Sequence, residues 1–109
     1  MGKERTDIMN EETLQLALVQ LKDRMGINYD DDDVTKLTPP LKAAYNYFKH
    51  DILYTDTLEV EPETTLFTLI VERARYDLMN SVDIFPKNYR SDIGQLISRY
   101  DYDKFKAGV

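Results

Sequence analysis

The sequence contains no cysteine and a single histidine, His50. Disulfide bonds and thiolate metal sites are therefore excluded, and so is a structural zinc site, which needs several such ligands. The four glycines lie far apart, so the chain has no glycine-rich phosphate loop. No apolar run approaches the roughly 18 residues of a membrane span, and the N-terminus lacks the apolar core of a signal peptide. We expect a cytosolic protein without membrane contact.

The length and composition predict one small globular domain. The chain has 109 residues, of which 42% are hydrophobic and 31% charged. A chain of this length buries roughly two-thirds of its unfolded surface, enough for one modest core. We expect a single helical domain over residues 1–109, with a flexible N-terminus at 1–10.

The charge is acidic and unevenly distributed. The net charge is -6, which argues against a general nucleic-acid binder, because such proteins normally carry a basic surface. From Lys87 to Val109 there are five basic and three acidic residues, so this segment carries +2 and the rest of the chain -8. This pattern predicts either a tail that docks on another acidic surface or ordinary surface scatter.

The apolar spacing predicts a first helix at about 11–25. Leucines and a methionine recur at intervals of four, three and four residues. Asn10 can accept a hydrogen bond at the helix start, and Gly26 suits the residue after its end. Both boundaries are therefore predicted from local sequence.

A second apolar stripe runs from Val34 to Ile52 and keeps helical phase through Pro39 and Pro40. Proline is tolerated in a first turn but removes a hydrogen bond further inside. We therefore predict a short helical turn at 32–37, a cap at Thr38 and a helix at about 39–53, nearly collinear but kinked.

The second half of the chain predicts two further helices. A helix at about 63–80 is apolar nearly all round at its start, which is typical of a central buried helix. Asn80 to Arg90 lacks helical periodicity and predicts a loop, with a short extended piece at Val82 to Phe85. Ser91 can cap a last helix at about 92–105. The predicted fold class is therefore all-α: about four helices, a long loop between the third and fourth, and a flexible C-terminal segment.

Four consecutive aspartates precede the second helix. In a helix–loop–helix calcium site, acidic ligands stand at positions 1, 3 and 5 and glycine at position 6. Counting from Asp31, Asp33 falls at position 3, but Thr35 and Lys36 fall at 5 and 6. The run therefore reads as acidic residues that complement the positive end of a helix. We predict no metal and no cofactor.

No constellation predicts an enzyme. His50 lies off the apolar stripe and is expected to be exposed, and no serine stands in a nucleophile-turn context. The eight tyrosines are candidates for base stacking or for protein interfaces. The acidic net charge favours core and interface positions over nucleic acid.

The order of five short sequence segments resembles that of a known family. The segments are LKDRMGI at 21–27, DDDDV at 30–34, AAYNYFKHDI at 43–52, TLFTLIVERARYDLMN at 65–80 and IGQLISRYD at 93–101. In this order they resemble the head–tail connector proteins of tailed bacteriophages, also called head-completion or adaptor proteins. The resemblance covers about residues 11–101 and rests on helix order rather than on a catalytic motif.

The resemblance implies a mechanical, non-enzymatic role. Subunits would form a ring, expected to be dodecameric, that docks on the portal protein and carries the stopper or tail-completion protein. Double-stranded DNA would pass through the ring without specific binding. The protein would lie in the virion at the head–tail interface and in the host cytoplasm during assembly.

The same resemblance implies two sets of site residues. The aspartates would line the channel and repel DNA phosphates, and the locally positive C-terminal segment, about 91–109, would be ordered by the portal. The channel-lining candidates are Asp30, Asp31, Asp32 and Asp33. The portal-interface candidates are Arg90, Ile93, Leu96, Ile97, Arg99, Tyr100, Tyr102 and Phe105.

Two alternative functions are compatible with the sequence. The acidic charge and the aspartate run also suit a small helical phage-encoded regulator that mimics DNA and inhibits a host protein. A metal-assisted enzyme that uses the aspartates is the third hypothesis, although the spacing of the run does not favour it.

Overall fold

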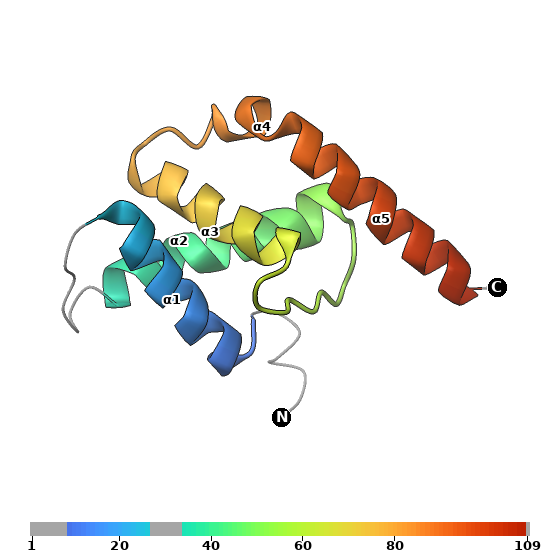
Figure 1. The fold of residues 1–109 in the computed structure, drawn as a ribbon, viewed down its shortest axis with the longest axis horizontal. Coiled ribbons are helices and arrows are strands. Elements are labelled where there is room, and N and C mark those ends of the chain that lie inside the picture. The colour runs from blue at the N-terminus through green and yellow to red at the C-terminus, as the bar shows by residue number, and fades with distance from the viewer. Residues whose placement is uncertain (1–8, 27–33, 109) are drawn as a thin grey trace.

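The fold was analysed in a computed structural model that describes residues 9–26 and 34–108. Within these ranges the chain forms helices and no strand, so the predicted all-α class is confirmed. Figure 1 shows a small bundle with one long helix that extends beyond it. The elements are α1 (Glu11–Met25), α2 (Val34–Asn46), the π-helix η3 (Tyr47–Ile52), α3 (Thr65–Leu78), α4 (Phe85–Asn88) and α5 (Arg90–Gly108).

Helix α1 has the predicted boundaries and the predicted caps. The Asn10 side chain accepts a hydrogen bond of 2.8 Å from the backbone N–H of Thr13. Gly26 ends the helix in the left-handed region, with φ 72°, and its N–H donates to the carbonyl of Lys22. A residue with a Cβ adopts this conformation at a cost, which explains glycine here.

The predicted cap at Thr38 is wrong, because α2 runs without interruption from Val34 through Pro39 and Pro40. The two missing N–H groups would have bonded the carbonyls of residues 35 and 36, which belong to the first turn of the helix. Leu37 and Leu41 lie on the buried face on either side of the prolines. Burial of this continuous stripe favours an unbroken helix over a separate turn.

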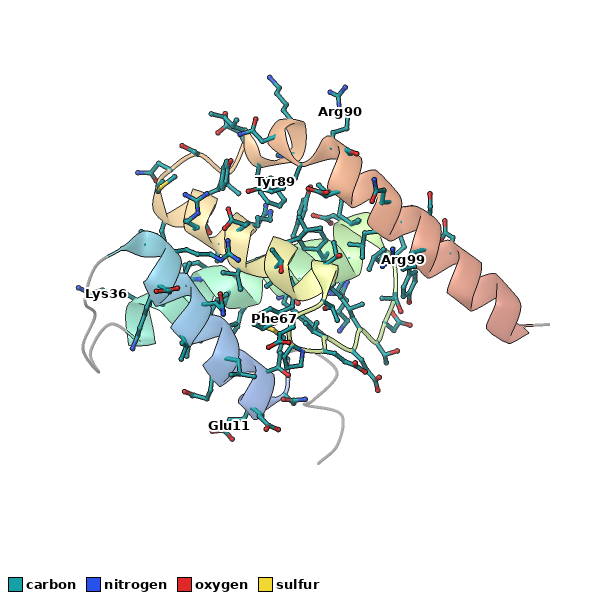
Figure 2. The ribbon with its side chains drawn as sticks, in the orientation of Figure 1. Glu11, Lys36, Phe67, Tyr89, Arg90 and Arg99 are labelled. Atoms are coloured by element: carbon teal, nitrogen blue, oxygen red, sulfur yellow. The ribbon has the colours of Figure 1, made fainter. Side chains whose placement is uncertain are left out.

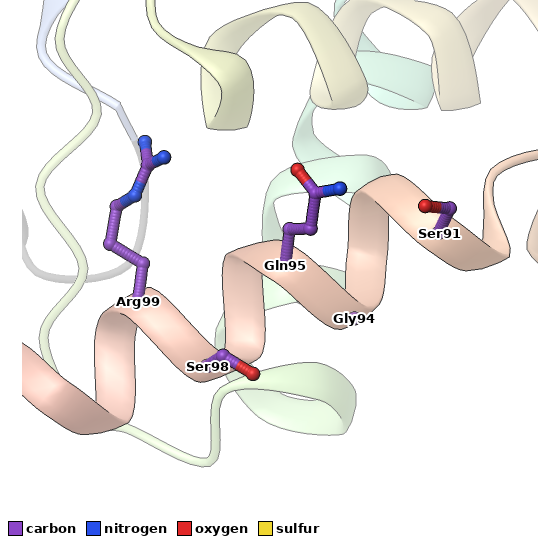
Figure 3. Close-up of a pocket in the computed structure, with 5 residues that line it drawn as sticks. All are labelled: Ser91, Gly94, Gln95, Ser98 and Arg99. Atoms are coloured by element: carbon purple, nitrogen blue, oxygen red, sulfur yellow. The ribbon is translucent and has the colours of Figure 1, made fainter.

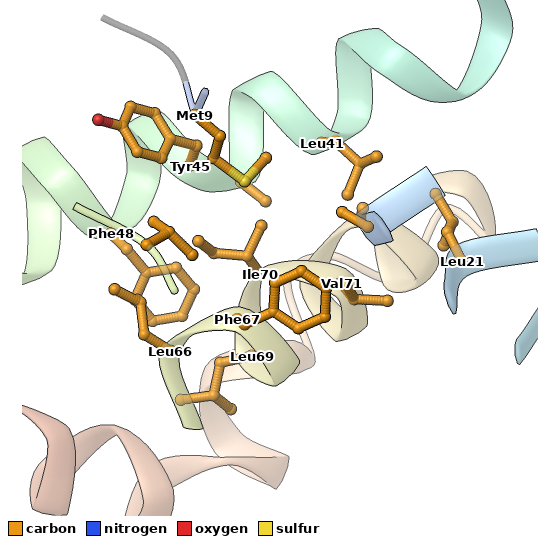
Figure 4. Packing of buried hydrophobic residues seen from close by; sticks show 14 of the residues in the cluster. Met9, Leu21, Leu41, Tyr45, Phe48, Leu66, Phe67, Leu69, Ile70 and Val71 are labelled. Carbon is orange, nitrogen blue, oxygen red and sulfur yellow. The ribbon is translucent and has the colours of Figure 1, made fainter. Parts of the chain in front are cut away.

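Helix α3 is the central element, as predicted. Seven of its residues are buried, and Figure 4 shows Phe67, Ile70 and Val71 between side chains of α1 and α2. The helix begins at Thr65 rather than near 63, because Glu63 has a left-handed φ of 65° that a helix cannot contain. Thr64 instead caps the helix, and its hydroxyl oxygen accepts from the N–H of Phe67.

The predicted extended piece at Val82 to Phe85 is also wrong. Residues 82–84 form turns and Phe85–Asn88 form the short helix α4. Phe85 is fully buried, and its burial gives the segment a fixed anchor that its sequence pattern does not reveal. Pro86 stands in the first turn of α4, where a missing N–H leaves no hydrogen bond unmade.

Helix α5 begins at Arg90, so the predicted cap at Ser91 is wrong. The N–H of Tyr89 donates to the carbonyl of Phe85, and the N–H of Ile93 donates to the carbonyl of Tyr89. These bonds carry helical geometry from α4 into α5 before Ser91 is reached. At 19 residues, α5 is about 28 Å long, and its C-terminal end lies beyond the other helices in Figure 1.

Gly26 and Gly94 allow the same substitution to be tested with opposite expected signs. Gly26→Ala should lower the free energy of unfolding by about 1 kcal/mol, because φ is positive there. Gly94→Ala should raise it by roughly 0.5–1 kcal/mol, because Gly94 lies inside α5 and alanine favours a helix. An added Cβ meets nothing within 4 Å at either position. Urea unfolding measures the change in unfolding free energy of each variant. Changes of the same sign would contradict the left-handed conformation at Gly26 or the helical one at Gly94.

Candidate interaction surface

The buried carboxylate of Glu72 joins three parts of the fold. It lies on α3 and accepts hydrogen bonds from Arg24 at 2.6 Å, from Arg75 at 2.7 Å and from the hydroxyl of Tyr89 at 2.8 Å. Arg24 lies near the end of α1, and Tyr89 lies immediately before α5. This network therefore fixes both outer helices relative to α3.

The network keeps Glu72 charged. Burial acts to raise the pKa of Glu72, but the hydrogen bonds from Arg75 and Tyr89, with the charges of Arg75 and Arg24, outweigh it and hold the pKa below its ordinary value. Burial and the hydrogen bond to Glu72 raise the pKa of Tyr89 to about 12. Tyr89 therefore remains a neutral donor to the carboxylate at neutral pH.

An aromatic cluster fixes the segment between α3 and α5. The ring of Phe85 stacks on that of Tyr89 with centroids 4.8 Å apart, and meets the rings of Tyr47, Phe48 and Tyr76 edge-on. Edge-to-face and offset-stacked pairs of this kind add to the energy of apolar burial. The cluster and the Glu72 network together hold the first turn of α5.

The π-helix η3 changes which residue enters the core. In an uninterrupted α-helix the apolar stripe through Phe48 would continue to Ile52, as its spacing in the sequence predicts. The N–H of Leu53 instead donates to the carbonyl of Phe48 at 2.9 Å, a bond across five residues. The wider turn buries Leu53 and leaves Ile52 half-buried. Ile52 thereby becomes available to a surface groove.

That groove lies between η3 and the start of α5 and has a volume of about 370 Å³. Its described lining is apolar along most of its length and basic at the α4–α5 junction. In Figure 2 Arg90 projects away from the body at this junction, whereas the neighbouring Tyr89 turns inward. The described lining residues are Tyr47, Ile52, Pro86, Lys87, Arg90, Ile93, Gly94 and Ile97.

The wall formed by Tyr47 is supported from α3. The guanidinium carbon of Arg73 lies 3.9 Å from the centroid of the Tyr47 ring, a close cation–π contact. The Nε of Arg73 is buried and has no hydrogen-bond partner among the described residues. Burial lowers the pKa of Arg73. The ring and the guanidinium thus hold each other in place beside the groove.

A second, shallower hollow of about 670 Å³ lies along another face of α5. Its described residues are Ser91, Gly94, Gln95, Ser98 and Arg99. Figure 3 shows Gln95 and Arg99 projecting to the same side of the helix, with Ser98 directed the other way. The described lining of this hollow is therefore polar apart from one glycine.

The predicted portal-interface residues occupy different surroundings. Arg90 and Arg99 are exposed, and Ile93 is buried. Leu96, Ile97 and Tyr100 are half-buried and pack against the core of the chain itself. Tyr102 and Phe105 lie within α5, but their side chains are outside the described part. The structure therefore brings Arg90, Ile93 and Ile97 into one groove and separates Arg99 from it.

The aspartates at 30–33 lie outside the described residues. His50 is exposed, as predicted. Across residues 9–26 and 34–101, no group of three or more histidine, aspartate or glutamate side chains is placed to hold a metal ion.

Several residues of the surface carry no signal in the sequence. Glu72 lies in the charged segment ERAR, whose composition is typical of a solvent-exposed helix face. Ile52 enters the groove through the π-helical turn, which no local sequence pattern predicts. In the sequence, Lys87 is distinguished only by belonging to the positively charged C-terminal segment. The helical spacing of Ile93 and Ile97 after Arg90 is the signal that the sequence does carry.

Comparison with known proteins supplies no relative: no family model, curated protein or solved structure matches the chain. Among the described residues, no helix is both long enough and apolar enough to span a bilayer.

Glu72→Gln should lower the free energy of unfolding by about 2 kcal/mol at neutral pH, because hydrogen bonds to a charged acceptor are lost. The pKa of Glu72 is lower in the folded than in the unfolded chain. Its contribution is therefore complete above the unfolded pKa and disappears as the pH falls through the folded pKa.

The difference in unfolding free energy between wild type and Glu72→Gln should stay constant near neutral pH. It should shrink below about pH 4.5, the ordinary pKa of a glutamate side chain. Denaturant unfolding across this range measures it, with the exposed Glu59→Gln as the matched control. A difference that persists unchanged in acid would contradict a charged Glu72.

Proposed function

We propose that the protein is a structural assembly subunit, a ring-forming head–tail connector that docks on a viral portal and extends its DNA channel. The observation that carries this proposal is α5. Its first turns are anchored by the Glu72 network and Phe85, while its C-terminal part lies beyond the other helices. A helix fixed at one end and projecting at the other is suited to reach a partner.

The chemistry of α5 supports a protein partner. Arg90 and Arg99 are exposed on this helix, in a chain whose net charge is -6. Such separation of charge favours orientation of each subunit during association, because the basic segment is attracted to acidic surfaces while the body is repelled. The half-buried Leu96 and Tyr100 add apolar area at the base of the projecting part.

A ring explains how one small domain serves a channel. Heterologous contacts between copies close into a ring when the rotation per subunit divides a full turn. In such a ring an acidic body repels the DNA phosphates, so duplex DNA slides through without specific binding. The stopper or tail-completion protein would then dock on the ring.

Mixing this protein with the portal it serves should add a ring of density to the portal in negative-stain images. Arg99→Glu should reduce the docked fraction several-fold at low salt, because a positive charge on the projecting helix is reversed, and the loss should diminish as salt screens the charge. Lys42→Glu, an equal charge change at an exposed position of α2, is the matched control and should dock normally.

Portal particles that gain no density would contradict the connector role. Binding to a host nucleic-acid enzyme, competed by DNA and insensitive to Arg99→Glu, would instead support the acidic DNA-mimic alternative. The two roles are thus separated by the same pair of variants.

A further inference from the structure

Helix α1 presents an exposed apolar pair between two acids. Leu16 is 43% and Val19 60% exposed, although both are large apolar side chains. Glu12 precedes Leu16 by four residues and Asp23 follows Val19 by four, and both are exposed. At 3.6 residues per turn these four side chains share one face of the helix. We call Glu12, Leu16, Val19 and Asp23 the α1 stripe.

The groove between η3 and α5 has the complementary chemistry. Its apolar lining matches the two apolar residues of the α1 stripe, and Lys87 and Arg90 at one end match an acid. None of its described lining residues is acidic. The α1 stripe has an acidic residue at each end. In either orientation of the stripe along the groove, one of these acids therefore lies at the end that carries Lys87 and Arg90. Opposite charges around an apolar centre provide both register and specificity.

The two surfaces lie on different sides of the molecule. Helix α1 packs on α2 and α3, whereas α5 packs on α3 and α4, and Figure 1 shows α1 and α5 on opposite sides of α3. A contact between them in separate copies is therefore head-to-tail. A pair of copies joined in this way retains one free α1 stripe and one free groove, so the contact adds further copies and closes into a ring when the rotation per subunit divides a full turn.

We propose that the α1 stripe of one copy of this chain occupies the groove between η3 and α5 of the next copy. The occupant is a second copy because both complementary surfaces are present on this one chain. The inference rests on the proposed ring-forming function and identifies its subunit contact. In this contact Arg90, Ile93 and Ile97 bind the neighbouring subunit, whereas the projecting part of α5 remains free to bind the portal.

Single engineered cysteines test the contact, because the chain has none of its own. Val19→Cys places a thiol on the α1 stripe, and Gly94→Cys places one in the groove, where an added Cβ meets nothing within 4 Å. The two variants are mixed at millimolar concentration without portal and oxidised. The mixed disulfide should form about tenfold faster than between Gly94→Cys and Ala43→Cys, an exposed control on α2.

A charge exchange provides a second, independent readout. Reversal of the two acids (Glu12→Lys with Asp23→Lys) on the Val19→Cys chain should lower the cross-linking rate about tenfold, because like charges then face each other. Reversal of the two bases (Lys87→Glu with Arg90→Glu) on the Gly94→Cys chain should do the same. Combining the two reversed chains should restore the rate, which a folding defect would not do.

The proposal is overturned if the Val19–Gly94 pair cross-links no faster than the control pair. It is also overturned if Val19→Cys pairs chiefly with itself, since that contact would be isologous and would stop at dimers. These results are separable from the portal experiment with wild-type protein. Portal rings without Val19–Gly94 cross-links would refute this contact alone, and cross-links without portal docking would refute the connector role alone.

Discussion

The buried charge of Glu72 constrains the whole arrangement. A carboxylate on the central helix is stable away from water only while donors surround it, because an unpaired buried charge costs several kcal/mol. Its donors come from the end of α1 (Arg24), from α3 itself (Arg75) and from the residue before α5 (Tyr89). The network therefore ties two outer helices to α3, and together with the Phe85 cluster it fixes the direction in which α5 leaves the body.

Features set by neighbouring residues were predictable from the sequence, whereas those set by distant contacts were not. Both ends of α1 followed from Asn10 and Gly26, which act within four residues. The Glu72 network joins residues up to 48 positions apart. Helix α4 exists because Phe85 enters an aromatic cluster whose other members lie mostly on different elements. Local propensity predicts neither the Glu72 network nor helix α4. The sequence therefore predicted a loop where α4 lies.

The groove shows the same division within one site. Its α5 wall was predictable, because Ile93 and Ile97 repeat with helical spacing beside Arg90. Its opposite wall was not, because it depends on one widened turn. The bond from Leu53 to the carbonyl of Phe48 moves Leu53 into the core and Ile52 to the groove. π-helical turns are often found at functional sites, and here the turn places an apolar residue on an accessible surface.

In the proposed contact, the placement of α5 would couple folding to assembly. The half-buried Ile97 of α5 packs against the chain's own core and also borders the groove. An occupant that covers the groove removes the remaining apolar area of this wall from water and so stabilises the docked position of α5. Since Tyr89 ties the first turn of α5 to Glu72, that stabilisation extends to the central helix. Assembly on this surface would therefore increase the stability of the subunit as well as join it to its neighbour.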